Sequence, residues 1–286
     1  MTQNKRLLTA LTHGGATTLV AGVVLFLIGA RQAGFGDDSP LTTTLGVVGM
    51  IVAIIGACSA VVGGFGLLVR SGRSIGLMSW LLIPVGVALD FALAALNNVL
   101  KLPLFLDSVG HILAGLLGGP IVGGLTGFLG VLTNSAFQPS AIVWCFQGAT
   151  IGILVGLLAQ WKMFKGVGRS VISTLIVIVT SIVMSSVISI IVYGGIDTYT
   201  SSALVVFFQK IGFGLVPAVV IKSTIVEFVD KIISVGLPLI VVVAMSSRLL
   251  NQFVTGPKLR ELKTEAASEV AANEAVDDSY GSYGEQ

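Results

Sequence analysis

The chain has 286 residues, of which 54% are hydrophobic and only 10% are charged, and its formal net charge is +2. A mean hydropathy of +0.98 excludes an ordinary soluble domain, in which roughly a quarter of the residues are charged. The basic residues are scattered rather than clustered with aromatic residues, which argues against nucleic-acid binding. We expect an all-α polytopic membrane protein, because lipid-facing backbone must satisfy its own hydrogen bonds and about 20 apolar residues form a spanning helix.

Two apolar segments, 7–30 and 44–69, come first in the chain. Lys5 and Arg6 precede the first segment, an arrangement that is also found in signal peptides. The length of the segment is nearer to a full membrane span than to the short apolar core of a signal peptide, so we predict a retained helix. Residues 1–74 are therefore assigned to two additional N-terminal transmembrane helices. Cys58 and Cys145 lie in apolar runs and are the two cysteines of the chain, so neither a disulfide framework nor a metal cluster is expected.

Residues 75–250 are predicted to form a six-helix membrane core. Its apolar segments fall at 75–100, 108–118, 120–135, 141–161, 171–193 and 224–247. The second and third of these would read as one overlong helix without the sequence Gly118-Gly119-Pro120. Because proline lacks a backbone donor and glycine permits a sharp turn, a helical hairpin is predicted there.

An interrupted apolar stretch at 203–221 decides the topology. If this stretch does not cross the membrane fully, both termini are cytoplasmic and eleven of the sixteen basic residues face the cytoplasm, as the positive-inside rule requires. We therefore predict a partial or outward-lying helix at 203–221. The eleven residues are Lys5, Arg6, Arg70, Arg73, Lys162, Lys165, Arg169, Arg248, Lys258, Arg260 and Lys263.

The C-terminal residues 251–286 are expected to form a hydrophilic acidic cytoplasmic tail. From Thr255 onward this part of the chain carries half of the fourteen acidic residues and has no sustained apolar face. Such a composition predicts a disordered segment or a fraying helix.

Small residues recur every four positions in two segments of the core. Gly115, Gly119, Gly123 and Gly127 form one series, and Gly148, Gly152 and Gly156 form the other. This spacing places glycines on one helix face and predicts close approach of helix backbones.

Amide, acidic and aromatic residues gather at the predicted outward ends of the core helices, where they could bind a polar, ring-containing metabolite. For each residue the alternative is an interfacial cap or belt position. The predicted substrate-binding residues are Asn97, Asn98, Asp107, His111, Asn134, Gln138, Trp144, Gln147 and Glu227, and Tyr193, Asp197, Tyr199 and Gln209 fall at the same level.

Two further sets of ionisable residues fall within apolar segments. Asp90 lies in mid-span, where it is either a proton-relay group or a residue that hydrogen-bonds between helices. Glu227 and Lys231 are spaced to form an i,i+4 pair on one helix face, which favours local neutralisation over catalysis. The chain lacks the phosphate-binding motif G-x-x-x-x-G-K-[ST] and the zinc motif H-E-x-x-H. No enzymatic activity, cofactor or metal is therefore expected of it.

Several short sequences occur together in a recognisable order. They are Pro103-Leu104-Phe105-Leu106-Asp107-Ser108-Val109-Gly110, then Gly118-Gly119-Pro120, Gly123-Gly124, Gly127 and Thr133-Asn134, and later Val229-Asp230-Lys231-Ile232-Ile233-Ser234-Val235. In this combination, over roughly residues 75–250, the chain resembles the substrate-capture (S) components of energy-coupling factor (ECF) transporters.

The resemblance implies a six-helix plasma-membrane subunit that binds a vitamin-like or nucleoside-like micronutrient on the outer side. It also implies partners: membrane lipid and an ECF-type transmembrane coupling subunit that carries two ATPase subunits, which would supply the missing nucleotide site. Family members dock through small residues four apart on their first helix; Ala88 and Ala92 match that spacing here, with Ala95 nearby. The alternative reading of such a stripe is ordinary internal packing.

Two features differ from the family pattern: the additional helices before residue 75, and His111, which stands where a small hydroxyl residue is expected. Two other functions stay open from the residues alone. One is a proton-coupled secondary transporter in which Asp90 or Asp107 titrates. The other is a membrane sensor subunit that does not transport.

Overall fold

The computed structural model describes residues 75–101, 106–197 and 200–260, together with residues 262, 264 and 268. Both predicted N-terminal helices, and most of the predicted tail, lie outside these residues. The described part consists of helices and connecting turns, without a β-strand, which confirms the all-helical class. Three helical segments within it are long and apolar enough to cross a membrane: Leu77–Leu100, Pro139–Gln160 and Val167–Tyr193.

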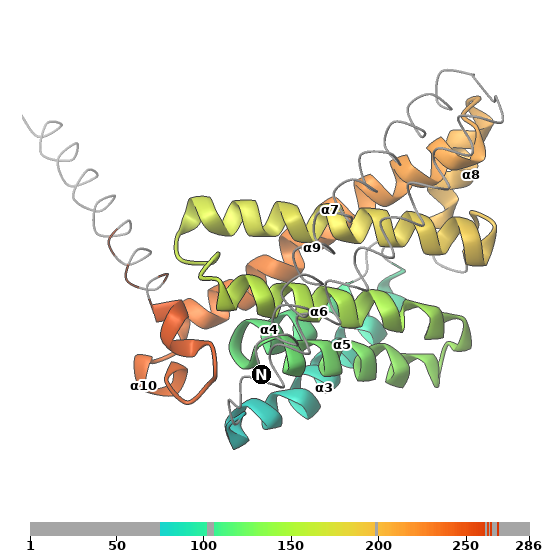
Figure 1. The fold of residues 1–286 in the computed structure, drawn as a ribbon. Helices are drawn as coiled ribbons and strands as arrows, with labels where there is room; N and C mark the ends of the chain where they lie inside the picture. The colour runs from blue at the N-terminus through green and yellow to red at the C-terminus, as the bar shows by residue number, and fades with distance from the viewer. Residues whose placement is uncertain are drawn as a thin grey trace, which may run out of the picture.

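The helices lie close to the predicted segments (Figure 1). In chain order they are α3 (Leu77–Leu100), η1 (Leu106–Ser108), α4 (Val109–Gly118), α5 (Pro120–Ser135), η2 (Pro139–Trp144), α6 (Cys145–Gln160), α7 (Val167–Tyr193), α8 (Ser202–Lys210), α9 (Leu215–Ala244) and α10 (Ser247–Leu250).

The predicted hairpin between α4 and α5 is confirmed. Helix α4 ends at Gly118 and α5 begins at Pro120, which occupies a first-turn position where a missing N–H leaves no hydrogen bond broken. Between them Gly119 has φ 85°, a left-handed backbone conformation that costs glycine nothing and other residues about 1 kcal/mol or more.

Glycines bring α4, α5 and α6 into close contact, as their four-residue spacing predicted. A methyl group on Gly152 would lie 2.1 Å from the carbonyl oxygen of Gly123, and one on Gly127 would lie 2.2 Å from the carbonyl oxygen of Gly148. No side chain fits at such distances. The helix backbones are therefore in direct contact, and this contact fixes the relative position of the polar residues that α4, α5 and α6 carry.

The stretch 203–221 does not form a single crossing. Helix α8 has nine residues, about 14 Å at 1.5 Å per residue, which is half of the hydrocarbon core. The chain then turns through Gly212, whose φ is 102°, and α9 begins at Leu215, nine residues before the predicted start at 224. Helix α9 thus has 30 residues and carries Lys222, Glu227, Asp230 and Lys231 near its middle.

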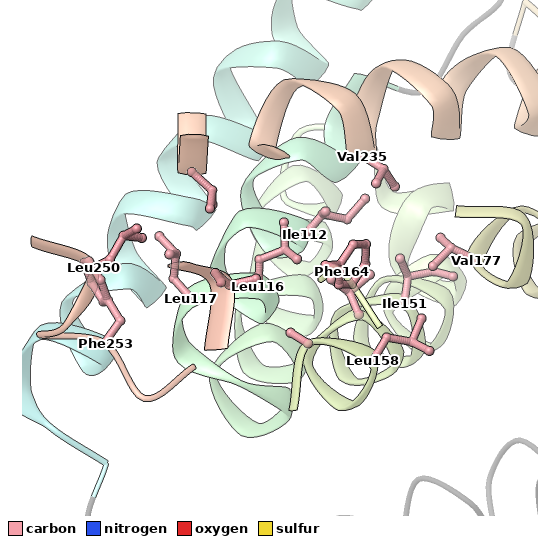
Figure 2. Packing of buried hydrophobic residues seen from close by; sticks show 14 residues of the cluster. Ile112, Leu116, Leu117, Ile151, Leu158, Phe164, Val177, Val235, Leu250 and Phe253 are labelled. Atoms are coloured by element: carbon pink, nitrogen blue, oxygen red, sulfur yellow. The ribbon is translucent and has the colours of Figure 1, made fainter. Parts of the chain in front are cut away.

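An apolar core lies among α4, α6, α7 and the last part of the described chain. Figure 2 shows Ile112 and Leu116 of α4 with Phe164, Ile151 and Val177, all of them buried. Leu250 and Phe253 extend this cluster beside Leu117.

Residues 251–260 pack on the core, in contrast to the tail predicted to begin at residue 251. The hydroxyl group of Thr255 donates to the carbonyl oxygens of Leu116 and Leu117, and its N–H donates to Leu117 at 3.1 Å. Leu259 is 1% exposed. These contacts pair carbonyl groups at the end of α4, which its own helix leaves without partners. The composition of this segment did not predict its packing on the core, because a few apolar residues are enough to dock so short a segment.

The described helices define two ends of the molecule. At one end lie η1 beside α3, η2 beside the C-terminus of α7, and α8 beside the start of α9; we call this the cavity end. At the other, the opposite end, the N-terminus of α3 meets the 251–260 segment, where Val254 N–H donates to Ser79 Oγ at 3.4 Å. Figure 1 shows α8 and α10 at opposite ends of the bundle.

Candidate solute-binding cavity

A polar cavity lies between four parts of the fold. Its volume is about 40 Å³, which holds a few water molecules but no larger metabolite. The lining residues come from η1 and α4, from α5, from η2 and α6, and from α9: Asp107, Ser108, His111, Val131, Asn134, Ala141, Trp144, Gln147, Gly148, Ile151, Glu227 and Lys231.

A smaller pocket adjoins the cavity at the same end. Its lining residues are Ala94, Asn97, Asn98, Leu106, Asp107, Asn134 and Gln138, so Asp107 and Asn134 belong to both spaces. Each of the nine residues predicted to bind substrate therefore lines one space or the other. Six line the cavity, namely Asp107, His111, Asn134, Trp144, Gln147 and Glu227, and Asn97, Asn98 and Gln138 line the smaller pocket. Whether they bind a substrate stays a prediction.

Asp90 fixes the start of α4 and the orientation of His111. Its Oδ1 accepts a hydrogen bond from Gly110 N–H at 2.6 Å, and its Oδ2 accepts one from His111 N–H at 3.1 Å. The ring nitrogen Nδ1 of His111 lies 2.9 Å from the same Oδ2. An ionised carboxylate only accepts hydrogen bonds, so Nδ1 is the donor of this third bond. Of the two roles open for Asp90, this geometry favours hydrogen bonding between helices.

Gly110 permits this arrangement by its lack of a side chain. A methyl group there would lie 2.1 Å from the carbonyl oxygen of Gly86 and 2.8 Å from Asp90 Oδ1. The close approach of α3 and α4 at this pair of glycines brings the Asp90 carboxylate to the first turn of α4. Unpaired backbone N–H groups and the positive end of the helix dipole favour a negative charge at that position.

Helix α9 contributes a buried ionic network. Lys231 Nζ lies 2.5 Å from Asp230 Oδ2 and 3.3 Å from Glu227 Oε2, and it donates to Ser108 Oγ at 3.0 Å. Gln147 Nε2 donates to Glu227 Oε1 at 3.1 Å. The lysine and both carboxylates are at most 2% exposed. Such groups are costly to bury unless they are paired, so this network holds α9, η1 and α6 in one arrangement.

Trp144 closes one side of the cavity. Its ring is stacked on Tyr193 of α7, with centroids 6.0 Å apart and an angle of 14° between the planes. The hydroxyl group of Tyr193 donates to the carbonyl oxygen of Ser140 in η2. Tyr193 thus supports the indole ring from outside the cavity, although it is not a lining residue.

Asp197 and Gln209, also predicted at this level, do not line the cavity. Asp197 is buried in an ion pair with Lys222, with 2.9 Å between Oδ2 and Nζ, and it also accepts a hydrogen bond from the hydroxyl group of Ser202. Gln209 is exposed on α8. Tyr199 lies outside the described residues.

Sequence reasoning missed Ser108 and Lys231 as parts of the cavity wall. Ser108 carried a signal, because it directly follows Asp107 in the motif of the resemblance. Lys231 lies four residues after Glu227, and its spacing indicated the ion pair correctly. The contact between Lys231 and Ser108 spans 123 positions, and no local pattern encodes a partner at that distance.

The predicted docking alanines lie on an outer face of α3. Ala88, Ala92 and Ala95 are exposed, whereas Asp90 and Ala94 point inward. The face is therefore accessible in the described structure.

Comparison with known proteins identifies no relative: no family profile, no curated protein and no solved structure matches this chain.

The sequence Gly72-Arg73-Ser74-Ile75-Gly76 has the spacing G-x-S-x-G, which in one hydrolase fold places a nucleophile between a strand and a helix. Its serine, Ser74, lies outside the described residues. Among the described residues, no group of three or more His, Cys, Asp or Glu side chains could hold a metal ion.

Proposed function

We propose that this chain is the substrate-capture subunit of an ATP-driven importer of the ECF type, for a vitamin-like or nucleoside-like micronutrient. The observation that supports the proposal is the convergence of polar side chains from α4, α5, α6 and α9 on one cavity inside an apolar bundle. Polar groups are costly within a membrane, and when they line a shared space they typically mark a solute pathway or binding site. The order of motifs described above favours the ECF family.

The distribution of basic residues supports a cavity that faces outward. Six basic residues lie at the opposite end of the described structure: Lys162, Lys165, Arg169, Arg248, Lys258 and Arg260. Two lie at the cavity end, Lys101 and Lys210. Because cytoplasmic loops carry an excess of Lys and Arg, the opposite end is assigned to the cytoplasm of a plasma-membrane protein. In this orientation the cavity receives solute from outside the cell, and both termini are placed inside.

The small volume of the cavity implies a change of shape on binding. Pockets for drug-sized molecules measure about 300–1,000 Å³, far above the space seen here. The cavity wall must therefore open to admit a vitamin-sized molecule. The shortest elements that line the cavity are η1 and η2, of three and six residues.

Transport is then assigned to a partner. The exposed alanines of α3 form a face on which a transmembrane coupling subunit with two ATPase subunits would dock, since small residues permit close helix packing in lipid. ATP hydrolysis in that partner would drive the movement that releases solute inside.

Uptake measured with and without a coupling module tests this proposal. The expected result is retention of solute by the isolated chain and sustained uptake only with the module and ATP. Sustained uptake by the isolated chain that collapses with the proton gradient would support a proton-coupled transporter instead. If mass spectrometry finds no small molecule bound to the purified protein and no solute is taken up, the sensor subunit is favoured.

Location of the site is tested by two substitutions. Asp107→Ala and Asn134→Ala should each weaken retention of the molecule that co-purifies with the chain, because both residues line the cavity and the adjoining pocket. Thr224→Val, on the exposed face of α9, is the control. Unchanged retention in both cavity variants would move the site elsewhere.

A further inference from the structure

We infer that the cavity selects a cationic solute that carries N–H donors, an inference that rests on the proposed solute-capture function and names its substrate class. The evidence is the chemistry of the atoms that line the cavity and have no protein partner, together with the charge around them.

The first unsatisfied atom belongs to His111. This side chain is 2% exposed, and its Nε2 has no hydrogen-bond partner. In the tautomer that donates from Nδ1 to Asp90, Nε2 carries the ring lone pair and is an acceptor. A histidine positioned in this way on the cavity wall is suited to receive a hydrogen bond from a ligand.

The second unsatisfied atom belongs to Gln147, which is 8% exposed. Its Nε2 donates to Glu227 Oε1, and this bond assigns the other amide atom as Oε1, a buried acceptor without a partner. Leaving a buried polar atom without a hydrogen bond is energetically unfavourable. Two such acceptors on one cavity therefore indicate a ligand that supplies donors.

The charge around the cavity points the same way. Asp90 accepts three hydrogen bonds and is satisfied within the protein. Three other carboxyl groups accompany one ammonium group here: Glu227 and Asp230 pair with Lys231, and Asp107 lines the same cavity as Lys231. The formal charge of this set is −2, or −1 if one carboxyl group is protonated. A cationic ligand reduces this excess, whereas an anionic ligand increases it.

Lys231 does not offer a site for an anion. Its ammonium group has three N–H donors, and Asp230, Glu227 and Ser108 lie within 2.5–3.3 Å of its Nζ. An anion would have to displace one of these contacts. Trp144 also lines the cavity, and indole rings attract cations that lie within about 6 Å of the ring centre.

Fluorescence of Trp144 provides a direct test in the full chain. The chain has three tryptophans, and Trp80 and Trp161 are 44% and 61% exposed, so Trp80→Phe and Trp161→Phe leave one reporter at the cavity. The probes are methylguanidinium, its neutral analogue methylurea, and acetate. Methylguanidinium should change the emission at a concentration about ten-fold below that of methylurea, as expected for a charge-assisted hydrogen bond. Acetate should leave the emission unchanged.

Variants of Glu227 assign the preference to its charge. Glu227→Gln keeps the shape and should bring the two probes to within about two-fold of each other, whereas Glu227→Asp should keep the order of affinities. Thr150→Val is the control, since Thr150 lies on α6 near Gln147 but donates only to its own helix at Phe146. Equal responses to all three probes, a response to acetate alone, or no response to methylguanidinium would overturn the inference.

Failure of this inference can be told apart from failure of the proposed function. ATP-dependent uptake of a neutral or anionic solute, with no cation preference at Trp144, would contradict the preference for a cation but support the importer proposal. Cation binding that depends on Glu227, without uptake in the presence of a coupling module, would support the preference for a cation but contradict the importer proposal.

Discussion

Lys231 on α9 donates a hydrogen bond to Ser108 at the start of α4, with 3.0 Å between Nζ and Oγ. The contact joins residues 123 positions apart and closes one side of the cavity. Since the same ammonium group neutralises Asp230 and Glu227, one lysine both links the two helices and balances the charges beside them.

Removing this lysine should destabilise the fold strongly. Lys231→Met keeps much of the side-chain volume but leaves two buried carboxylates without their partner, a change that costs about 3–5 kcal/mol. The measurement is the free energy of unfolding in mixed micelles. Lys210→Met on exposed α8 is the control, expected within about 0.5 kcal/mol of the parent chain. Equal stability of the two variants would mean that Lys231 has no structural role.

The buried pair of Asp197 and Lys222 lies away from the cavity and should contribute to stability alone. Asp197→Asn and Lys222→Met should each lower the free energy of unfolding by about 3–5 kcal/mol, since each leaves one buried charge unpaired. The double variant should lose less than the sum, because neither charge then remains. A strictly additive double-mutant cycle would contradict a direct interaction. Retention of solute by whichever variants fold should be unchanged.

Close packing of α5 against α6 predicts different outcomes for two glycines. Gly152→Ala places a methyl group 2.1 Å from a backbone oxygen of α5, so the helices must separate, at a cost of about 1–3 kcal/mol. Gly236→Ala, in the middle of α9, meets no atom within 4 Å and should be neutral or stabilising by up to about 1 kcal/mol. Thermal unfolding midpoints of the two variants provide the comparison. A stabilising Gly152→Ala would show that the backbone contact is looser than described.

The exposed alanine face of α3 should be required for transport but not for solute retention. Ala92→Phe adds bulk to that face and should abolish ATP-dependent uptake in the presence of a coupling module, because helices in lipid pack through small residues. Binding of solute by the isolated subunit should be unaffected. Ile225→Phe, at an exposed site on α9, is the matched control. Full uptake by Ala92→Phe would place the docking surface elsewhere.

Features encoded by neighbouring residues could be predicted from the sequence. The α4–α5 hairpin follows from Gly119 and Pro120 alone, and the close contact of α5 and α6 follows from glycines at a four-residue spacing. Asp107, Asn134 and Trp144 were expected to share one space, and all three line the cavity. Each of these features depends on helix periodicity and on positions at helix ends, which a single sequence displays directly.

Partners chosen by the tertiary fold could not be predicted in the same way. Asp90 was recognised as costly in mid-span, but its partners Gly110 and His111 depend on how α3 crosses α4. The start of α9 was placed nine residues late because Lys222 ends the apolar run of the stretch 203–221; Glu227 is a second charge within the same helix. Those charges are compatible with a buried helix only because Asp197 and Lys231 neutralise them.

The hydrogen bonds of Thr255 connect the C-terminal segment to the helix that lines the cavity, α4. Thr255 holds the last turn of α4, and the first turn of the same ten-residue helix carries His111. A helix of that length is about 15 Å long and moves as one unit. Displacement of the segment around Thr255 would therefore also displace the cavity wall that α4 carries, including His111.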